Sequence, residues 1–338
     1  MKQLWAVVLA AGEGKRMHSK LPKVLHPLCG KPMVEYILGS AAELTDNILI
    51  VVGHGASLVQ DTLKGKWRYV LQEQQLGTGH AVLKTLKALP AEGCLFVLCG
   101  DTPLIEPVHL KRLLAAHNGN AATVATTTLT DPTGYGRIIR STGNMVKQII
   151  EEIDASAEEK EIAEINTGTY CFDIKLLKHY LPLVGSENAQ NEYYLTDVIS
   201  LMQRDSHRTG IYQIEDHRVG LGINNRVQLA EAIHILQKRI NRSLMLNGVS
   251  MPDPASVHTD ADVVIGPDTE IMPNCVLQKG TVIGSDCRIG PGAHLRNAVI
   301  KDRVYIQHSV IVDSTVGTGI EIGPYAYLKN HKAEEELF

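Results

Sequence analysis

The sequence predicts an α/β domain with a mostly parallel sheet, followed by a smaller β-helix. Three observations support this prediction: apolar runs alternate with helical stretches in the first half, a long helical stretch follows, and the last third repeats every six residues. At 338 residues the chain is long enough for two domains. We expect the first domain to span residues 1–226, a linker helix residues 227–248, and the β-helix residues 249–338.

Strands in the first half are predicted over residues 4–9, 48–52 and 94–99. Their unbroken apolar character is typical of strands that are buried on both faces of a sheet. Helices are predicted over residues 32–43 and 80–89. A β-α-β-α order predicts a mostly parallel sheet with helices on both faces.

A single long helix is predicted over residues 230–246, and Gly248 and Pro252 end it. Five aliphatic side chains follow one side of this helix. They are Leu229, Ile233, Leu236, Ile240 and Leu244.

The last third of the chain has a period of six. The apolar positions are Ile265, Ile271, Leu277, Ile283, Ile289 and Leu295, then, after a slip, Ile300 and Ile306, and after another, Val316, Ile322 and Leu328. A six-residue repeat indicates a β-helix, in which each hexad forms one flat side of a three-sided coil. The pattern resembles the hexapeptide repeat of left-handed parallel β-helices, which typically associate as trimers, so we expect a homotrimer through the β-helix.

The composition is that of a globular protein, with 44% hydrophobic and 21% charged residues. A net charge of -4 gives no reason to expect nucleic acid or an anionic membrane as a partner. The apolar N-terminal run is short and leads directly into a charged loop, unlike a signal peptide, so we expect a cytoplasmic protein. The six cysteines form no CxxC pair, which argues against zinc.

A glycine loop follows the first predicted strand and reads Leu-Ala-Ala-Gly-Glu-Gly-Lys-Arg-Met over residues 9–17. Its spacing fits neither a dinucleotide fingerprint nor a P-loop. Small residues let the backbone approach a ligand and offer N–H groups to an anion. Arg16 and Lys23 add cations suited to phosphate. Taken alone, the loop fits a phosphate site and an ordinary turn equally well.

Asp101 comes just after the predicted strand of residues 94–99. In doubly wound sheets, ligand sites lie at the carboxyl ends of the strands. A carboxylate there suits Mg²⁺, although an Asp shortly before Pro103 also fits a simple turn.

The loop, with Pro22 and Lys23 after it, resembles the signature of sugar-1-phosphate nucleotidylyltransferases. Further segments look, in the same order, like those of the bacterial N-acetylglucosamine-1-phosphate uridyltransferases, and the resemblance reaches about Lys329. These segments are residues 72–81, 100–104, 131–138, 164–168, 192–197 and 222–226. The resemblance implies a Rossmann-like nucleotidyltransferase domain, a long linker helix and a truncated left-handed parallel β-helix.

The resemblance also implies the reaction and its cofactor. UTP and N-acetylglucosamine 1-phosphate would give UDP-N-acetylglucosamine, a cell-wall precursor, and pyrophosphate with the help of Mg²⁺. The family is bifunctional, but the residues of its acetyltransferase site come from coils beyond the matched region, so we expect no acetyltransferase activity. The alternatives are another sugar-1-phosphate nucleotidyltransferase, and a non-catalytic sugar-nucleotide-binding trimeric scaffold.

Individual roles follow from the same resemblance. Arg16 and Lys23 are the implied catalytic cations, and Asp101 and Asn224 are the implied metal ligands. The implied nucleotide-binding residues are Leu9, Ala11, Gly12, Gly14, Lys23, Gln72, Gly77 and Thr78, the last three reading the uracil. The implied residues around the sugar phosphate are Cys99, Gly100, Asp101, Gly136, Glu151, Asn166 and Asn224.

Two positions depart from the family pattern, and two adjacent glutamates could each occupy the family's glutamate position. Lys15 stands where the family usually has Thr, and Cys99 stands where it usually has a Tyr of the sugar pocket. Glu151 is preferred to Glu152 because it follows the apolar pair of residues 149–150 and best matches the family position. No histidine is needed as a base, since a sugar phosphate with a second pKa of about 6 is already a dianion at neutral pH.

Overall fold

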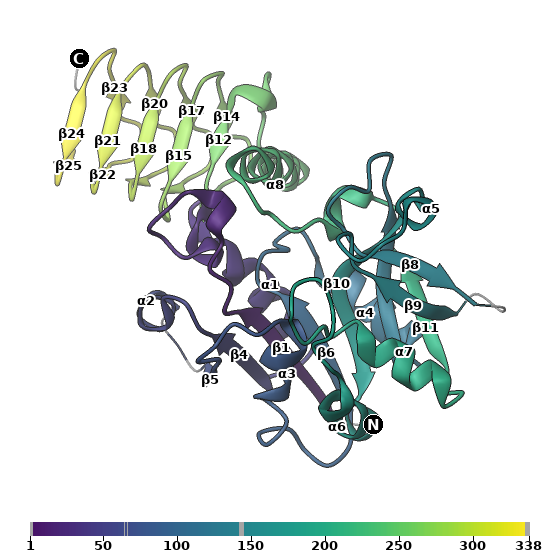
Figure 1. Cartoon of the computed structure of the whole chain (residues 1–338). Helices are drawn as coiled ribbons and strands as arrows, with labels where there is room; N and C mark the ends of the chain where they lie inside the picture. Colours follow the sequence, from purple (N-terminus) through teal and green to yellow (C-terminus); the bar gives the residue numbers. More distant parts are fainter. Residues whose placement is uncertain (1–2, 64, 66, 142–144, 335–338) are drawn as a thin grey trace. The chain divides into compact units, whose positions relative to one another are not determined.

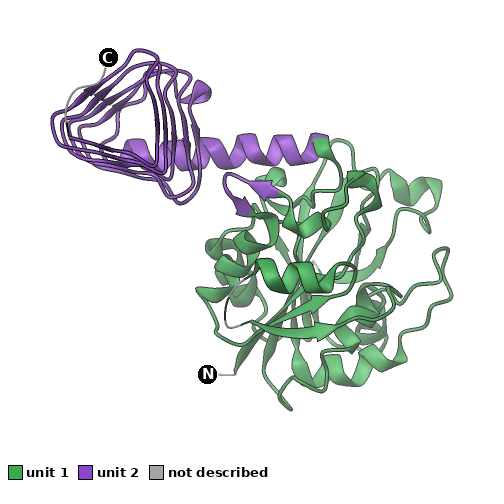
Figure 2. Ribbon diagram, turned by 90° about the vertical axis from the view of Figure 1, so that its left-hand side faces the viewer, with its two compact units in different colours: residues 1–26, 32–226 green, residues 27–31, 227–338 purple. Residues whose placement is uncertain are grey.

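A computed structural model describes residues 3–63, 65, 67–141 and 145–334 of the chain. The chain divides into two compact units, coloured separately in Figure 2. The first comprises residues 1–26 and 32–226, and the second residues 27–31 and 227–338. Among the described residues, no helix has the length and apolar character needed to cross a membrane.

The first unit contains a nine-stranded sheet, in which seven strands follow the order β11-β7-β10-β6-β1-β4-β5 (Figure 1). The other two, β8 and β9, form a hairpin, and β8 also pairs with β10. The strands are β1 (Leu4–Ala10), β4 (Ile48–Val52), β5 (Arg68–Leu71), β6 (Cys94–Cys99), β7 (Ala122–Thr128), β8 (Arg137–Arg140), β9 (Val146–Ile150), β10 (Glu164–Asp173) and β11 (Thr209–Gln213).

The centre of this sheet is parallel, as predicted: β1 runs parallel to both β4 and β6. Strand β10 is an exception that the sequence did not reveal, since it runs antiparallel to both β6 and β7. It follows a hairpin and the one-turn helix α5 (Ala157–Lys160), whereas parallel strands are usually joined by a full crossover helix.

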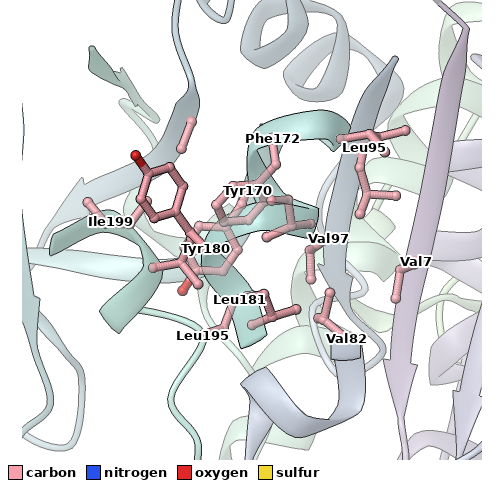
Figure 3. Packing of buried hydrophobic residues seen from close by; sticks show 14 of the residues in the cluster. Val7, Val82, Leu95, Val97, Tyr170, Phe172, Tyr180, Leu181, Leu195 and Ile199 are labelled. Atoms are coloured by element: carbon pink, nitrogen blue, oxygen red, sulfur yellow. The ribbon is translucent and has the colours of Figure 1, made fainter. Parts of the chain in front are cut away.

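Helices cover both faces of the sheet, because alternate side chains of each strand point to opposite faces. In β1, Trp5 and Val7 belong to one buried cluster, with α3, α6 and α7, and Ala6 and Val8 belong to another, with α1, α2 and α4. Figure 3 shows the first cluster, in which Val82 and Ile199 come from helices. The helices are α1 (Met33–Ala42), α2 (Ala56–Thr62), α3 (Thr78–Leu83), α4 (Pro107–Ala116), α6 (Ile174–Tyr180) and α7 (Asp197–Arg204).

Helix α3 is shorter than the helix predicted over residues 80–89 and begins two residues earlier. After Leu83 the backbone closes into turns, in which the amides of Thr85 and Ala88 bond to carbonyls three residues back. The Thr85 hydroxyl also donates to the Val82 carbonyl. Such local bonds by Thr offer the backbone an alternative to a continued helix.

The second unit contains three parallel sheets whose strands alternate along the chain, which is the arrangement of a β-helix. All eleven apolar residues of the predicted repeat are buried in its core. Its strands are β12 (His258–Thr259), β13 (Val264–Ile265), β14 (Glu270–Ile271), β15 (Val276–Gln278), β16 (Val282–Ile283), β17 (Arg288–Ile289), β18 (His294–Arg296), β19 (Val299–Ile300), β20 (Tyr305–Ile306), β21 (Val310–Val312), β22 (Thr315–Val316), β23 (Glu321–Ile322), β24 (Tyr327–Lys329) and β25 (Lys332–Ala333).

The slips in the sequence repeat correspond to shorter coils. Ile265 pairs with Ile283, 18 residues on, but Ile283 pairs with Ile300 and Ile300 with Val316, which are 17 and 16 residues on. The repeat skipped Ile311, which is fully buried between Leu295 and Leu328 on one sheet. The parallel stacking is therefore kept when a side loses a residue.

Helix α8 (Arg226–Leu246) begins four residues before the predicted segment. Its buried side also differs from the prediction, because Gln237 and Asn241 are buried whereas Ile233 and Ile240 are only partly so. The Asn241 amide donates to the carbonyls of residues 254 and 257, and Gln237 donates to that of residue 259. These carbonyls need donors once they are buried, so polar side chains take the place expected for aliphatic ones.

Candidate active site

A cavity of about 510 Å³ lies in the first unit, where β1 and β6 end. Most predicted site residues line it: Leu9, Ala11, Gly12, Gly14, Arg16, Lys23, Gln72, Gly77, Thr78, Cys99, Asp101 and Asn224. Six further residues line it as well: Glu13, Lys15, Val24, Gln75, Ala81 and Glu192. The cavity thus combines the glycine loop, the end of β6 and segments far apart in sequence.

The glycine loop brings a lysine close to the backbone of the loop. Gly14 has a positive φ of 69°, which favours glycine, and a Cβ at this position would lie 2.6 Å from the Lys23 Cβ. The loop continues into the short 3₁₀ helix η1 (Lys15–Met17), and Lys23 begins a second one, η2 (Lys23–Leu25). Glycine at position 14 therefore allows the loop and Lys23 to pack together.

Four side chains, which we call the cation cluster, converge in the cavity: Arg16, Lys23, Asp101 and Asn224. The Lys23 ammonium forms an ion pair with Asp101 and donates to the Asn224 Oδ1 at 3.1 Å. Arg16 donates to the same oxygen at 2.9 Å. One carboxylate oxygen and one amide oxygen from distant segments therefore share the Lys23 ammonium group as a partner.

The orientation of Asn224 is fixed by its own segment. The amide Nδ2 donates to the Gly222 carbonyl at 3.2 Å, which directs Oδ1 toward the two cations. The backbone of Ile223 donates to the Asp101 carbonyl at 2.9 Å and joins the two segments. Both converging atoms are hard oxygens, the ligands that Mg²⁺ prefers, so Asp101 and Asn224 fit a divalent cation. Within the described residues, no three His, Cys, Asp or Glu side chains gather as an alternative metal site.

Gln72 is buried on another wall of the cavity, with its amide NH₂ group fully engaged. It lies 3.1 Å from the Gly77 carbonyl and 3.1 Å from the His80 Nδ1. Burial lowers the pKa of His80, which favours a neutral ring that can accept this bond. Gly77 itself has a φ of 105°, and a Cβ there would lie 2.6 Å from the Tyr193 carbonyl. The amide oxygen of Gln72 is thereby held in a fixed direction.

Gly100, Gly136, Glu151 and Asn166 do not line the cavity. Gly100 donates its backbone N–H to the Leu9 carbonyl and joins β6 to β1. The other three and Tyr170 form a second group, which we call the Glu151 cluster. In it, a Cβ at Gly136 would lie 3.3 Å from the Glu151 Oε2, and Asn166 donates to the Tyr170 hydroxyl at 2.6 Å.

The Glu151 carboxyl group accepts a hydrogen bond from Thr196 at 3.2 Å. Burial is the main cause of a raised pKa of this carboxyl group, and the neighbouring carboxylates of Asp197, Asp154 and Glu192 raise the pKa further. The Thr196 bond acts in the opposite direction. The carboxyl group therefore stays protonated to a higher pH than an exposed glutamate would.

Cys99 lies between the cation cluster and the Glu151 cluster. Its thiol lines the cavity and donates to the Gly168 carbonyl at 3.3 Å. Burial raises its pKa to about 12, helped by the charges of Asp101 and Glu151 and opposed by that of Lys23. A thiol with so high a pKa stays protonated at neutral pH and is a poor nucleophile.

The additional residues of the cavity include two that sequence reasoning could have found. Gln75 and Glu192 lie within the segments 72–81 and 192–197 that carried the family resemblance. By contrast, Val24 is an ordinary apolar residue of η2, and only the folded chain shows that it reaches the cavity.

The site combines a glycine loop, two cations and converging oxygens at the carboxyl edge of an α/β sheet. This is the arrangement of a nucleotidyltransferase. Residues 6–165 match the model of the MobA-like NTP transferase domain. Residues 259–333 match the model of the GMPPB C-terminal domain. The fold of this chain is similar to that of a UDP-glucose pyrophosphorylase complexed with UDP-glucose, with a TM-score of 0.60 and 20% identity over 71% of this chain and 100% of that one.

Closer relatives in sequence identify the family. The chain is 48% identical to the Bifunctional protein GlmU of Listeria welshimeri over 97% of its own length and 73% of the relative. It is 44% identical to the protein of that name from Caldanaerobacter subterraneus over 97% of its length and 72% of the relative. The chain therefore belongs to the GlmU family, and its function is that of a sugar-1-phosphate uridylyltransferase.

Proposed function

We propose that the chain transfers the uridylyl group of UTP to N-acetylglucosamine 1-phosphate in the cavity of the first unit. The observation that carries this proposal is the convergence of Asp101 and Asn224 on one positive charge beside the glycine loop. The products are UDP-N-acetylglucosamine and pyrophosphate. Residues 1–226 would form the catalytic domain, residues 227–248 the linker helix, and residues 249–338 a left-handed β-helix through which the chain forms a homotrimer in the cytoplasm.

The sugar phosphate is the nucleophile. One of its oxygens forms a bond to the α-phosphorus of UTP, while the bond from that phosphorus to the bridging oxygen of the β-phosphate breaks. Because the nucleophile is already a dianion, the protein has to position it and stabilise negative charge rather than remove a proton. Lys23 and Arg16 supply charges for this purpose from the cation cluster.

Asp101 and Asn224 would hold Mg²⁺. When bound, the ion would neutralise the charge of the two phosphates that must approach each other and act as a Lewis acid. In the structure, the Lys23 ammonium compensates the Asp101 charge at this place. Both oxygens already contact this one ammonium group, which would have to give up its place to the ion.

The uracil and the sugar would bind on opposite sides of the cation cluster. Leu9, Ala11, Gly12 and Gly14 would line the nucleotide, and Gln72, Gly77 and Thr78 would read the base. The Gln72 amide oxygen suits the N3–H donor of uracil, since its NH₂ group is already engaged. On the other side, Cys99, Gly100, Gly136, Glu151, Asn166 and Asn224 would contact the sugar hydroxyls, the acetamido group and the phosphate.

A panel of nucleotides and sugar phosphates tests this proposal, with pyrophosphate release measured with and without EDTA. We expect rapid release only from UTP with N-acetylglucosamine 1-phosphate, and none in EDTA. Equal rates with glucose 1-phosphate would favour another sugar-1-phosphate nucleotidyltransferase instead. Binding of the nucleotide sugar without any turnover would favour the non-catalytic scaffold.

A further inference from the structure

Arg137 has the largest fully buried side chain of the described residues, and it has no role in the reaction proposed above. It is the first residue of β8 and only 1% exposed. Its guanidinium group bonds to the carbonyls of Tyr135 and Lys160 and lies 2.7 Å from the Glu152 Oε2. A guanidinium group is costly to bury unless it is paired, so this network needs a reason.

Two of the three partners of Arg137, Tyr135 and Glu152, are chain neighbours of residues in the Glu151 cluster. Gly136 precedes Arg137 in the chain, and Glu151 precedes Glu152. Strand pairing places Arg137 opposite Ile150, so the ion pair joins the two strands of the hairpin just beyond their last pair. Asn166 donates its backbone N–H to the Gly136 carbonyl at 2.8 Å, which connects the third member of the cluster.

The two adjacent glutamates have different partners. Glu151 accepts from Thr196 and approaches Gly136, while Glu152 pairs with Arg137. The sequence Glu-Glu alone contains nothing that decides which carboxyl group faces the Gly136 side. A single buried guanidinium forms an ion pair with Glu152 and hydrogen bonds to two carbonyls, which its planar fork allows.

A second arginine on the same strand provides a comparison. Arg140 ends β8 and pairs with Glu164 at 2.6 and 2.8 Å, but its side chain is 33% exposed. Both pairs join neighbouring strands of the sheet. Arg137 differs from Arg140 in two respects: it bonds to carbonyls on either side of the hairpin, and its ion-pair partner is the neighbour of Glu151.

We propose that Arg137 is a positioning residue, which holds Glu152 aside so that the Glu151 carboxyl group faces the sugar-binding side of the site. This inference rests on the sugar-binding role proposed above for Glu151. It assigns no contact between Arg137 and a substrate. Loss of Arg137 should therefore impair binding of the sugar phosphate and leave UTP binding intact.

The test is a double-mutant cycle of Arg137→Lys and Glu151→Gln, with Arg140→Lys as the matched control. Lysine keeps the charge but is shorter and lacks the rigid planar fork, so it cannot reproduce the arginine's bonds to all three partners. We expect Arg137→Lys to raise the KM for N-acetylglucosamine 1-phosphate about tenfold, as a misplaced binding group does. The KM for UTP should stay within about twofold in both arginine variants, and Arg137→Lys should add little in the Glu151→Gln background.

The cycle separates the two ways of failing. If Glu151→Gln alone leaves the KM for the sugar phosphate unchanged, the proposed role of Glu151 is wrong and the inference falls with it. If Glu151→Gln raises that KM, and the double variant shows the full product of the two single-variant increases, the two residues act independently. In that case only the inference about Arg137 is overturned. Equal changes in both KM values would reduce Arg137 to a structural residue.

Glu152→Gln provides a milder variant should Arg137→Lys fail to fold. The amide keeps an oxygen acceptor for the guanidinium but loses the charge. We expect it to raise the KM for the sugar phosphate several-fold, in the same direction as Arg137→Lys. An unchanged KM in a folded Glu152→Gln variant would overturn the inference.

Discussion

The cation cluster and the Glu151 cluster are held in place by different means. In the first, Arg16, Lys23, Asp101 and Asn224 bond to one another across the cavity, so their charges are satisfied by the same groups that would meet the substrate. In the second, the Glu151 carboxyl group is partly buried and its neighbours are fixed by strand pairing. We therefore expect the first cluster to exchange partners when a substrate binds, and the second to be preformed.

This difference implies different consequences of mutation. Charges that act on the phosphates matter most as the transition state forms, so their loss should lower kcat. A preformed group that recognises the sugar contributes about equally to ground-state and transition-state binding, so its loss should raise KM. A set of variants in both clusters can break or sharpen this distinction.

Asp101→Ala should have the largest effect. It removes the only carboxylate of the implied metal site and leaves Lys23 without its ion-pair partner. We expect kcat to fall on the order of a thousandfold, about 4 kcal/mol, because a Lewis acid contributes several kcal/mol to charge stabilisation. Pyrophosphate release at saturating substrates measures it, with the exposed Asp61→Ala of α2 as control. Near-normal activity of folded Asp101→Ala would show that the metal is held elsewhere.

Lys23→Met should lower kcat about a hundredfold, the usual loss when one preorganised donor is removed from a transition state. The methionine keeps the length of the side chain and its packing against Gly14. Lys20→Met, on the exposed part of the same segment, is the matched control. A change confined to the KM for UTP would instead make Lys23 a ground-state binding residue.

Glu151→Gln should mainly weaken binding of the sugar phosphate. Loss of one hydrogen bond to a charged or strongly polarised acceptor costs about tenfold in affinity, so we expect the KM for N-acetylglucosamine 1-phosphate to rise by that factor. The KM for UTP and kcat should change little. Glu158→Gln, exposed on α5, controls for the loss of an acid. If kcat fell a hundredfold, the two clusters would not differ as proposed.

The same variant tests the raised pKa of Glu151. Because burial raises its pKa in the folded state, the protonated form is favoured there, and stability is lost as the pH rises from the unfolded value of about 4.3 through the folded pKa. Relative to Glu151→Gln, the wild-type free energy of unfolding should therefore decline across this range. Urea denaturation at a series of pH values measures it, and a difference independent of pH would contradict the shift.

The sequence predicted the fold wherever a single physical pattern extends over many residues. Continuous apolar strands predicted the parallel centre of the sheet, and the six-residue period predicted the buried stripe of the β-helix. Strand β10 was missed, because direction depends on how the preceding chain enters the sheet and not on the composition of the strand. The polar side of α8 was missed because Gln237 and Asn241 donate hydrogen bonds to buried carbonyls of residues later in the chain, which the sequence of the helix itself does not reveal.

The cavity could be predicted to the extent that its residues lie in short motifs. The loop spacing and the position of Asp101 after a strand indicated the phosphate side. Neither Val24 as a wall of the cavity nor the partner of Arg137 could be foreseen, since both depend on long-range packing. Selecting Glu151 over Glu152 needed the family resemblance, whereas in the folded chain the two differ in their contacts: Glu151 accepts a hydrogen bond from Thr196, and Glu152 forms an ion pair with Arg137.

Lys15→Thr should have the smallest effect, and it restores the residue usual in the family. Lys15 lines the cavity, but its side chain is 81% exposed and pairs with Glu13 at 3.3 Å. An exposed charge acts on the triphosphate only through solvent, so we expect the KM for UTP to rise about twofold at low salt and the difference to vanish above about 0.5 M salt. Lys20→Thr is the control, and steady-state kinetics at two salt concentrations measure the effect. A loss of kcat that persists at high salt would instead place Lys15 in direct contact with the phosphates and make it a fifth member of the cation cluster.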